Sequence, residues 1–338
     1  MPFSLAATTP RPRVPYAHAA RSSVRGQWFV RDEAIMGTAI HVELWCGDAV
    51  VGHAAADAVI QEMHRIDRAM SPYKPDSELS RVNREAFATP VPVSHEMFTL
   101  LQRAAHFSEL SDGAFDITYA AVGQLYDYRA GTLPTRDAIA RARQAVGHRQ
   151  LRLDADPRSV RFAREGMRID LGGFAKGHAV DTSVALLREF GIAHAIVSAG
   201  GDSRVIGDRR GRPWSVAVRD PRRADAIVAV LPLEDTSIST SGDYERYFER
   251  DGVRHHHLID PKTGESPRTL RSVTILAADG LTCEALSKSV FVMGLDKGMR
   301  WVESLPGVDA IVVDAAGALH VSSGLLDARP QHAGDTPQ

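Results

Sequence analysis

The most informative stretch of the sequence is IDLGGFAKGHAVD, residues 169–181. The carboxylate of Asp170 ends an apolar segment, and Gly172 and Gly173 stand where a strand would turn into a helix. Lys176 falls in the first turn of that helix, where free backbone amides and the helix dipole favour an anion. The pattern suits a phosphate-bearing ligand, although a tight turn with one exposed lysine would explain the same residues. It is not a Walker A loop, which needs a different spacing.

The elements around this unit favour an α+β fold with a mostly antiparallel sheet, because strands and helices are interspersed without a βαβ rhythm. Residues 158–173 are expected to form paired strands, followed by a helix from about Phe174 to Phe190 that Gly191 ends. Other expected elements are two strands within 28–46 joined at Met36-Gly37, a loop over 71–76, helices over 53–70 and 94–110, a short helix within 129–150 and a helix carrying Glu284.

Composition excludes several classes of protein. The net charge of −2 and the pI near 6.7 give no basic excess, so no nucleic-acid partner is indicated. The two cysteines, Cys46 and Cys283, provide neither a disulfide framework nor a zinc cluster. No run of 18 or more apolar residues occurs, so no membrane-spanning helix is expected.

The ends of the chain differ from its middle. We expect residues 1–26 to form a flexible arm, residues 27–326 a folded domain, and residues 327–338 a loose tail. The first residues contain no apolar stretch long enough for a secretory signal and no cysteine for a lipid. A cytoplasmic location is therefore expected, or a periplasmic one if the start of the chain is wrongly assigned.

Two aromatic features have more than one explanation. The histidines His255–His257 precede Leu-Ile-Asp-Pro, and alternation along a strand would place His255 and His257 on one face and His256 on the other. A histidine near a ligand can act as acid or base, but a histidine-rich strand at a solvated edge explains the pattern equally well. Tyr73, in its proline loop, is either a packing residue or an exposed plate for a planar ligand.

A third feature is the pair Glu284 and Lys288 within LTCEALSKSVFVMG, residues 281–294. Glu followed by Lys four residues later is a common helix-surface ion pair, worth about 0.2–0.5 kcal/mol. The alternative is half of a metal site in which one ligand has been replaced.

Taken together in their order, eight stretches resemble the FAD:protein FMN transferase family, ApbE. The similarity covers roughly residues 30–325, and its specificity comes from the order of the motifs because no single one is decisive. The stretches are MGT (36–38), SPYKPDSELSRVN (71–83), DGAFDIT (112–118), IDLGGFAKGHAVD (169–181), AGGD (199–202), STSGDYERYF (239–248), HLIDPKTG (257–264) and LTCEALSKSVFVMG (281–294).

The resemblance implies an α+β fold with an FAD site between lobes. It also implies Mg²⁺-dependent cleavage of the FAD pyrophosphate, with transfer of FMN through its phosphate to a Thr or Ser hydroxyl of an acceptor protein and departure of AMP. Some members instead hydrolyse FAD to FMN and AMP. The acceptor protein and the oligomeric state are not specified by the sequence.

The resemblance also implies roles for individual residues. His257 and Lys176 are the expected catalytic residues, His257 as general base or substrate positioner and Lys176 as a cation beside the pyrophosphate. The implied FAD-binding residues are Met36, Tyr73, Ala114, Phe115, Asp116, Asp170, Lys176 and His257. The implied metal site consists of the Gly173 carbonyl, Glu284, Ser287 and Lys288.

The last motif departs from the family pattern, which has Asp and then Thr four residues later, both facing Mg²⁺. Here Glu284 reaches one methylene further, and the ammonium of Lys288 has no lone pair to offer a metal. The first hypothesis is that Mg²⁺ stays on Glu284, the Gly173 carbonyl, FAD oxygens and water, with Lys288 swung aside. The second is that Lys288 partly replaces the charge of the metal. The third is that the chain binds FAD but cleaves it poorly.

These hypotheses leave three functions open. The leading one is an FMN transferase that acts on a protein. The alternatives are an FAD pyrophosphatase, which transfers to water, and a non-catalytic FAD-binding protein.

Overall fold

The computed structural model describes residues 26–223 and 225–327. The arm expected at 1–26 and the tail expected at 327–338 therefore lie, except for one residue each, outside the described residues. Within them, strands and helices are interspersed as the sequence predicts, and every paired strand is antiparallel.

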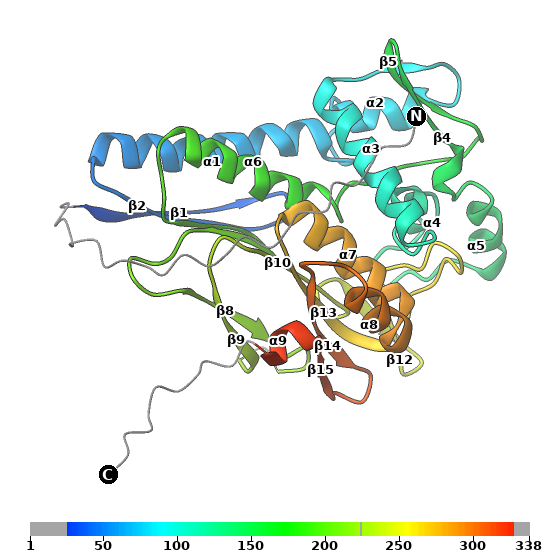
Figure 1. Ribbon diagram of the computed structural model, residues 1–338. Helices are drawn as coiled ribbons and strands as arrows, with labels where there is room; N and C mark the ends of the chain where they lie inside the picture. Colours follow the sequence, from blue (N-terminus) through cyan, green and yellow to red (C-terminus); the bar gives the residue numbers. More distant parts are fainter. Residues whose placement is uncertain (1–25, 224, 328–338) are drawn as a thin grey trace.

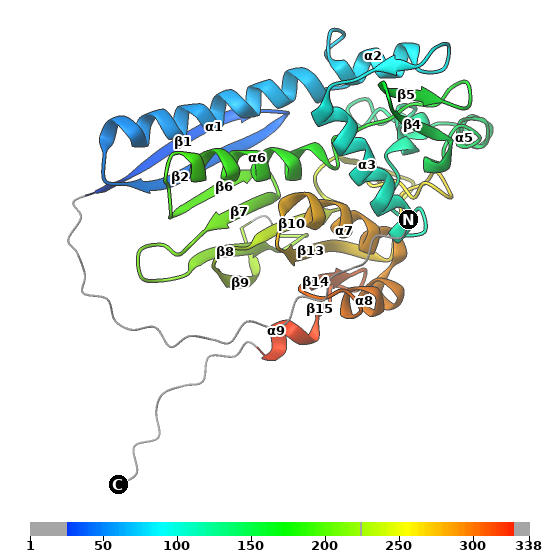
Figure 2. The ribbon, with the colours of Figure 1, turned by 45° about the horizontal axis from the view of Figure 1, so that its top comes forward.

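The central element is an eight-stranded antiparallel sheet with strand order β1-β2-β6-β7-β10-β13-β14-β15 (Figures 1 and 2). Its strands are β1 (Gln27–Ile35), β2 (Thr38–Cys46), β6 (Ala195–Ala199), β7 (Asp202–Ile206), β10 (Ser237–Gly242), β13 (Leu270–Ala277), β14 (Asp309–Asp314) and β15 (Leu319–Val321). The expected pair of strands within 28–46 is confirmed, with Met36 and Gly37 at the turn, both at positive φ.

Three helices cover one face of this sheet (Figure 2): α1 (Ala49–Met70), α6 (Ala175–Glu189) and α7 (Gly280–Met293). Helix α1 begins four residues before the expected 53–70 because the Asp48 carboxylate caps it, accepting hydrogen bonds from the amides of Val50 and Val51. Helix α8 (Leu295–Glu303) follows and packs against α7 and β14. The buried apolar side chains of these helices and of the covered sheet face form the main core.

The opposite face of the sheet is covered by the hairpin of β8 (Trp214–Arg219) and β9 (Ile227–Leu233), with the short helix α9 (Ser323–Asp327) near its end (Figure 1). Trp214 is almost fully buried there, 3% exposed, and meets Trp28 edge to face at a centroid distance of 5.5 Å. A second apolar cluster forms between hairpin and sheet, made of Val205, Trp214, Val218, Leu233, Ile238, Leu276 and Ile311.

The remaining elements lie beside one end of the large sheet (Figure 1). Helix α3 (His95–Leu110) begins after Ser94, whose hydroxyl caps it as expected, and the short helix α5 (Arg136–Arg143) lies within 129–150 as expected. The others are α2 (Glu78–Glu85), β3 (Val91–Pro92), η1 (Ile117–Tyr119), α4 (Ala120–Gly123), η2 (His148–Gln150), β4 (Leu151–Ala155), β5 (Arg158–Phe162), β11 (Tyr247–Arg250) and β12 (Val253–His256).

The expectation of paired strands across 158–173 is wrong in its second half. Only Arg158–Phe162 forms a strand, and its partners are β4 and β3. The later segment is held by a side chain instead, because the Asn83 amide bonds both the N–H and the carbonyl of Ile169, at 2.8 and 2.9 Å. With its backbone groups satisfied in this way, the chain reaches Asp170 without a strand partner.

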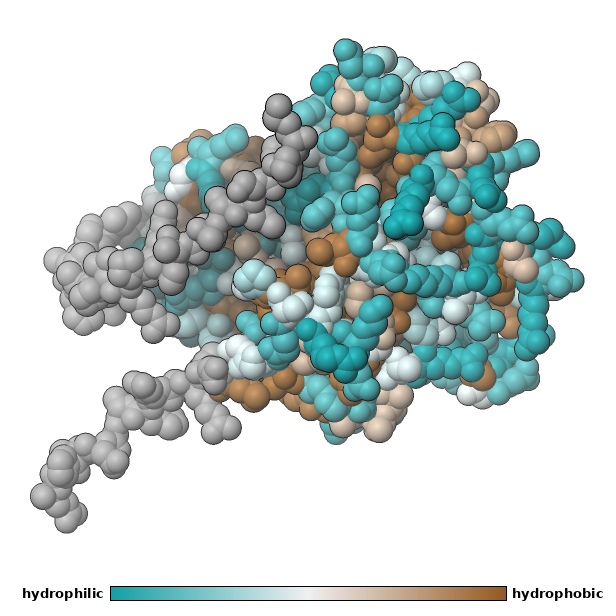
Figure 3. Space-filling model, turned by 45° about the vertical axis from the view of Figure 1, so that its right-hand side comes forward, coloured by the Kyte–Doolittle hydropathy of each residue, from teal (hydrophilic) through white to brown (hydrophobic). Residues whose placement is uncertain are grey.

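The described part of the chain contains no helix of the length and apolar character needed to cross a membrane. On the face of the molecule shown in Figure 3, hydrophilic residues predominate and apolar ones occur in small groups among them.

Candidate active site

The crossing of helices α6 and α7 positions the candidate site. The two helices touch at glycines: a methyl group on Gly177 would lie 2.5 Å from the carbonyl oxygen of Gly280. The Asp181 carboxylate, on α6, accepts hydrogen bonds from the amides of Gly280 and Leu281 at the first turn of α7. This contact brings Lys176, at the start of α6, close to Glu284 on α7.

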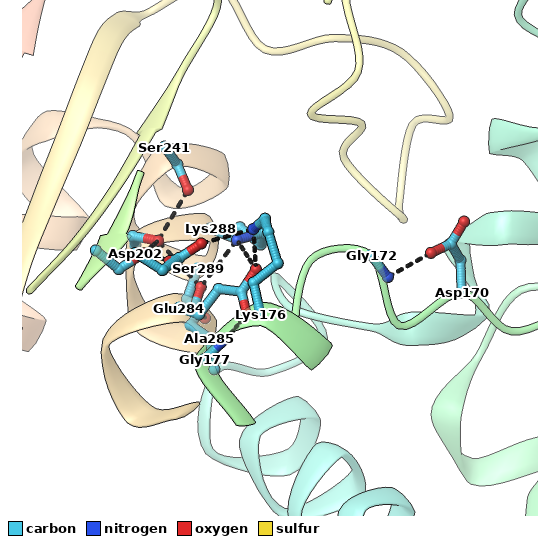
Figure 4. Close-up of polar contacts among 12 residues, drawn as sticks. Asp170, Gly172, Lys176, Gly177, Asp202, Ser241, Glu284, Ala285, Lys288 and Ser289 are labelled. Carbon is cyan, nitrogen blue, oxygen red and sulfur yellow. Dashed lines mark hydrogen bonds and ion pairs between the residues drawn. The ribbon is translucent and has the colours of Figure 1, made fainter. Parts of the chain in front are cut away.

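Lys176 lies between two carboxylates (Figure 4). Its ammonium donates to Asp202 Oδ2 and to Glu284 Oε1, both at 2.6 Å, and the side chains of Asp202 and Glu284 are 3% and 0% exposed. Although burial opposes it, Asp202 and Glu284 hold the pKa of Lys176 above its ordinary value. The other oxygen of Glu284 accepts from the Gly177 amide at 2.7 Å, so Glu284 itself occupies an anion position at the α6 N-terminus.

Lys288 also faces Glu284. Its ammonium lies 3.3 Å from Glu284 Oε1 and 3.3 Å from the Glu284 carbonyl oxygen. Its stem stands over Gly173, because a methyl group on Gly173 would lie 2.6 Å from Lys288 Cε. Burial lowers the pKa of Lys288, and Glu284 offsets part of this effect. The hypothesis of a retained metal requires the Lys288 side chain to be swung aside. In the structure it contacts Glu284 instead.

The four residues expected to hold Mg²⁺ do not present a set of free oxygen ligands. Both carboxylate oxygens of Glu284 already accept hydrogen bonds, and the buried Ser287 hydroxyl is bonded to Ser241 at 2.8 Å and to the Glu284 carbonyl at 3.0 Å. Mg²⁺ demands six oxygen ligands in near-ideal octahedral geometry. Across residues 26–223 and 225–327, no group of three or more His, Cys, Asp or Glu is suited to a metal. The residues present therefore do not fit Mg²⁺ in the way that the family pattern implies.

His257 is the histidine of the triplet whose pKa responds to the charges of Lys288 and Lys176. Its Nδ1 atom is buried and has no hydrogen-bond partner among the described residues. Burial, the neighbouring His256 and the charge of Lys288 together lower its pKa to about 3, so the imidazole is neutral at physiological pH. His256 points into the core and its Nε2 bonds the Pro267 carbonyl, whereas His255 stacks on Phe248.

Among the described residues, the others expected to bind FAD make no hydrogen bond or ion pair with the charged cluster. Tyr73 is 81% exposed, whereas Phe115 is 5% exposed and packs on Phe107 and Phe174. Ala114 beside it is also buried, and Met36 is half-buried. Asp170 lies apart from the cluster in Figure 4, where its carboxylate accepts from the Gly172 amide at 2.5 Å. Burial raises the pKa of this carboxyl.

Asp116 has a structural role that the sequence did not reveal. Its oxygens accept from the amide and hydroxyl of Thr118 and from the amide of His148, at 2.6–2.8 Å. It borders a cavity of about 470 Å³ that extends to Arg143, Gln150 and Lys262. His148 and Gln150 also line it, and their buried atoms Nε2 and Oε1 have no hydrogen-bond partner within the described ranges. The cavity does not reach the charged cluster, which we take as the chemical centre because its charges converge there.

Two residues of the site were missed by the sequence reading. Asp202, the second partner of Lys176, stands in the AGGD motif, whose order pointed to the family but gave no role to the carboxylate. Arg246 influences the pKa values of both His257 and Asp170 and lies next to Gly37. The signal for Arg246 was the STSGDYERYF motif, in which it is the only basic residue.

Comparison with known proteins identifies relatives over most of the chain. A family model described as the ApbE family matches residues 36–312. An FAD:protein FMN transferase of Treponema pallidum is 34% identical over 318 residues, 88% of this chain and 88% of the relative, and one of Haemophilus influenzae is 31% identical over 284 residues, 79% of this chain and 81% of the relative.

Solved structures agree with the sequence relatives. The ApbE protein of Thermotoga maritima matches with a TM-score of 0.83 and 34% identity, over 89% of this chain and 98% of that one. The flavin transferase ApbE of Vibrio cholerae matches with a TM-score of 0.78 and 26% identity, over 89% of this chain and 99% of that one. The α+β fold and the resemblance read from eight ordered motifs are thereby confirmed, and the chain belongs to the ApbE family.

Proposed function

We propose that this protein transfers FMN from FAD to a Thr or Ser hydroxyl of an acceptor protein and releases AMP. The observation that carries the proposal is that Lys176 and Lys288 meet at Glu284 and lie near enough to a neutral His257 to lower its pKa, in a chain whose relatives are named FAD:protein FMN transferases. Two cations beside a neutral base are the groups that phosphoryl transfer to a hydroxyl requires.

The reaction balances without an oxidant or a reductant. The acceptor hydroxyl oxygen forms a bond to the FMN-side phosphorus of FAD, and the bridging P–O bond breaks with its electron pair leaving on AMP. We assign to His257 the removal of the hydroxyl proton, because its imidazole is neutral at physiological pH. The negative phosphates of bound FAD would raise its pKa towards that of an effective base. We assign to the lysine ammonium groups the stabilisation of the negative charge on the phosphate oxygens, which grows in the transition state.

The cavity beside Asp116 supports a place for the adenine of FAD. Two residues that line it, His148 and Gln150, each have a polar atom without a hydrogen-bond partner among the described residues, and the exocyclic amino group of adenine carries two N–H donors. Tyr73, which is 81% exposed, supports a place for the isoalloxazine end of FAD, because a planar ring system stacks on an exposed aromatic side chain.

The family pattern and this chain differ in the source of positive charge at the pyrophosphate. The family pattern implies a Mg²⁺ ion, which would act there as a Lewis acid. Of the expected ligands, Glu284 and Ser287 are engaged and Lys288 cannot ligate while protonated, so that the Gly173 carbonyl alone would be left to hold the ion. No step of the proposal is therefore routed through the metal.

The test is incubation of purified protein with FAD and an acceptor domain that carries the flavinylation motif. We expect a covalently fluorescent acceptor and one AMP for each FMN attached. AMP that appears at the same rate without acceptor would instead identify an FAD pyrophosphatase. FAD bound at one equivalent with no AMP and no labelled acceptor would identify a binding protein and overturn the proposal.

A further inference from the structure

We propose that the Lys288 ammonium takes the place of the divalent cation in this protein, so that FMN transfer needs no bound metal. The inference rests on the proposed function and deepens it, because it names the group that neutralises the pyrophosphate. It starts from the departure of this chain from the family pattern, where Lys288 stands at the position of a metal-ligating threonine.

The first support is the charge balance of the cluster. Asp202 and Glu284 have two carboxylates and Lys176 and Lys288 two amines, with Lys176 bonded to both carboxylates and Lys288 to Glu284. With all four groups ionised, the formal charges of the cluster cancel. A divalent cation would add two positive charges beside two ammonium groups, without a free carboxylate oxygen to receive it, because both oxygens of Glu284 are taken.

The second support is steric. The stem of Lys288 runs over Gly173, whose carbonyl is the backbone ligand that the family pattern implies. Lys288 Cε and Cδ lie 2.6 and 2.9 Å from the position of a methyl group on Gly173. The Lys288 side chain thus places its ammonium in the space between Gly173 and Glu284. A metal ion bound there would have to displace this side chain.

The third support is that Lys288 is the cation with hydrogen-bonding capacity to spare. Lys176 is held by two carboxylates at 2.6 Å, whereas both contacts of Lys288 are at 3.3 Å. An ammonium has three N–H donors. Lys288 can therefore turn towards a phosphate oxygen while Glu284 remains paired with Lys176, and such a charge-assisted contact strengthens as negative charge develops.

The experiment measures transfer to the acceptor domain in EDTA and in Mg²⁺, for the wild type, for Lys288→Thr and for a control, Lys297→Thr. Lys297 is an exposed lysine on α8. We expect the wild-type and control rates to agree within twofold in the two solutions. In EDTA, we expect the transfer rate of Lys288→Thr to be at least ~100-fold below that of the wild type, the scale for removal of one transition-state donor. With Mg²⁺, we expect the rate of this variant to rise at least tenfold above its rate in EDTA. A wild-type rate that falls ~100-fold in EDTA and returns with Mg²⁺ overturns the proposal.

A second measurement does not depend on turnover. Mn²⁺ is titrated into the complex of each variant with FAD, and bound Mn²⁺ is counted by electron paramagnetic resonance. At millimolar Mn²⁺, we expect no stoichiometric Mn²⁺ site in the wild type or in the Lys297→Thr control. We expect one Mn²⁺ site either in the single variant Lys288→Thr or in the double variant Lys288→Thr, Glu284→Asp. One tight Mn²⁺ site in the wild type overturns the proposal even if the rates are insensitive to EDTA.

The two measurements separate this inference from the function on which it rests. If no variant labels the acceptor under any condition, the proposed transferase activity fails, and the Mn²⁺ titration still decides whether Lys288 excludes the metal. A third variant, Gly173→Ala, keeps both lysines but displaces the Lys288 stem. We expect it to lose at least tenfold in rate with unchanged melting temperature, and an unchanged rate would contradict the position assigned to the ammonium.

Discussion

His257 is a neutral imidazole at physiological pH, and one of its ring nitrogens has no hydrogen-bond partner among the described residues. Its Nδ1 has no partner in the described ranges, and its pKa is lowered to about 3, first by burial and then by His256 and Lys288. Because a general base contributes on the order of 10²–10⁴-fold, we expect His257→Gln to lower the transfer rate by about this factor while FAD affinity changes less than threefold. Stopped-flow labelling and equilibrium titration measure the two quantities.

The control for this variant is His255→Gln, since the His255 ring stacks on Phe248 and its pKa is shifted by burial and by Arg268, not by the two lysines of the cluster. It should keep the wild-type rate within twofold. A rate for His257→Gln that matches this control would show that another group takes the hydroxyl proton.

The same lowered pKa gives a pH dependence whose sign can be worked out. His257 has a folded-state pKa near 3, below the unfolded value of about 6.5. Between these values the unfolded chain binds the extra proton, so this histidine makes the fold less stable as the pH falls from about 6.5 towards 3. We expect the urea midpoint to drop more between pH 7.5 and pH 5 in the wild type than in His257→Gln, and equal drops would contradict the assignment.

At the residue scale, the sequence predicted which residue types would meet but not their contacts. Lys176, Glu284 and Lys288 do come together. Asp202 was missed because a carboxylate at the end of a glycine pair is typical of a turn as well as of a site. The pairing with Lys176 depends on how β7 and α6 pack, and this tertiary relation has no local sequence signal.

At the scale of elements, the crossing of α6 and α7 holds the two lysines together. A methyl group on Gly177 would lie 2.5 Å from the Gly280 carbonyl oxygen and 2.9 Å from the Leu281 Cα, both backbone atoms that cannot turn aside. We expect Gly177→Ala to force the helices apart and to lower the free energy of unfolding by about 1–3 kcal/mol, the range for overpacking. Urea unfolding followed by circular dichroism measures it.

The matched control is Ala185→Leu, which adds bulk to an exposed position of the same helix. Its effect should stay within about 0.5 kcal/mol. Should Gly177→Ala be as stable as this control, the contact between the helices would be looser than the structure indicates.

Local signals explain which elements the sequence could predict. Helix α3 was placed correctly because Ser94 is a strong cap, and α6 because Gly191 ends it at a positive φ. Helix α2 was not predicted, since it is short, polar and follows a proline loop. The segment before Asp170 was read as a strand because its apolar residues are buried, but the hydrogen bonds of Ile169 go to the Asn83 side chain, 86 positions away.

At the scale of the whole molecule, the β8–β9 hairpin closes the outer face of the large sheet. Trp214 is its largest buried side chain, 3% exposed, and belongs to one apolar cluster with residues of four sheet strands. We expect Trp214→Ala to lower the free energy of unfolding by about 3–5 kcal/mol, as for other buried aromatic truncations. The measurement is the urea midpoint, with the transition slope as a check on two-state behaviour.

Val230→Ala is the control, because Val230 lies on β9 of the same hairpin but is 58% exposed. A loss of stability as small as that of the control would mean that the hairpin is not part of the cooperative fold.

The overall architecture was the part most accessible from the sequence. Eight motifs in a fixed order indicated the family, and with it the α+β fold and the antiparallel sheet, which the structure and the relatives confirm. The strand order could not be read in this way, because β2 pairs with β6 and β7 pairs with β10 across long sequence separations that carry no pattern of their own. Which hairpin covers the outer face is equally a matter of long-range packing.

The contact between Lys288 and Gly173 also limits how such sequences can diverge. Because a methyl group at residue 173 would meet the lysine stem at 2.6 Å, a lysine at 288 tolerates only glycine at 173 without moving its charge. A threonine at 288 leaves that space free, so alanine becomes acceptable. Among homologues, the two positions should therefore covary, with lysine at position 288 occurring only together with glycine at position 173.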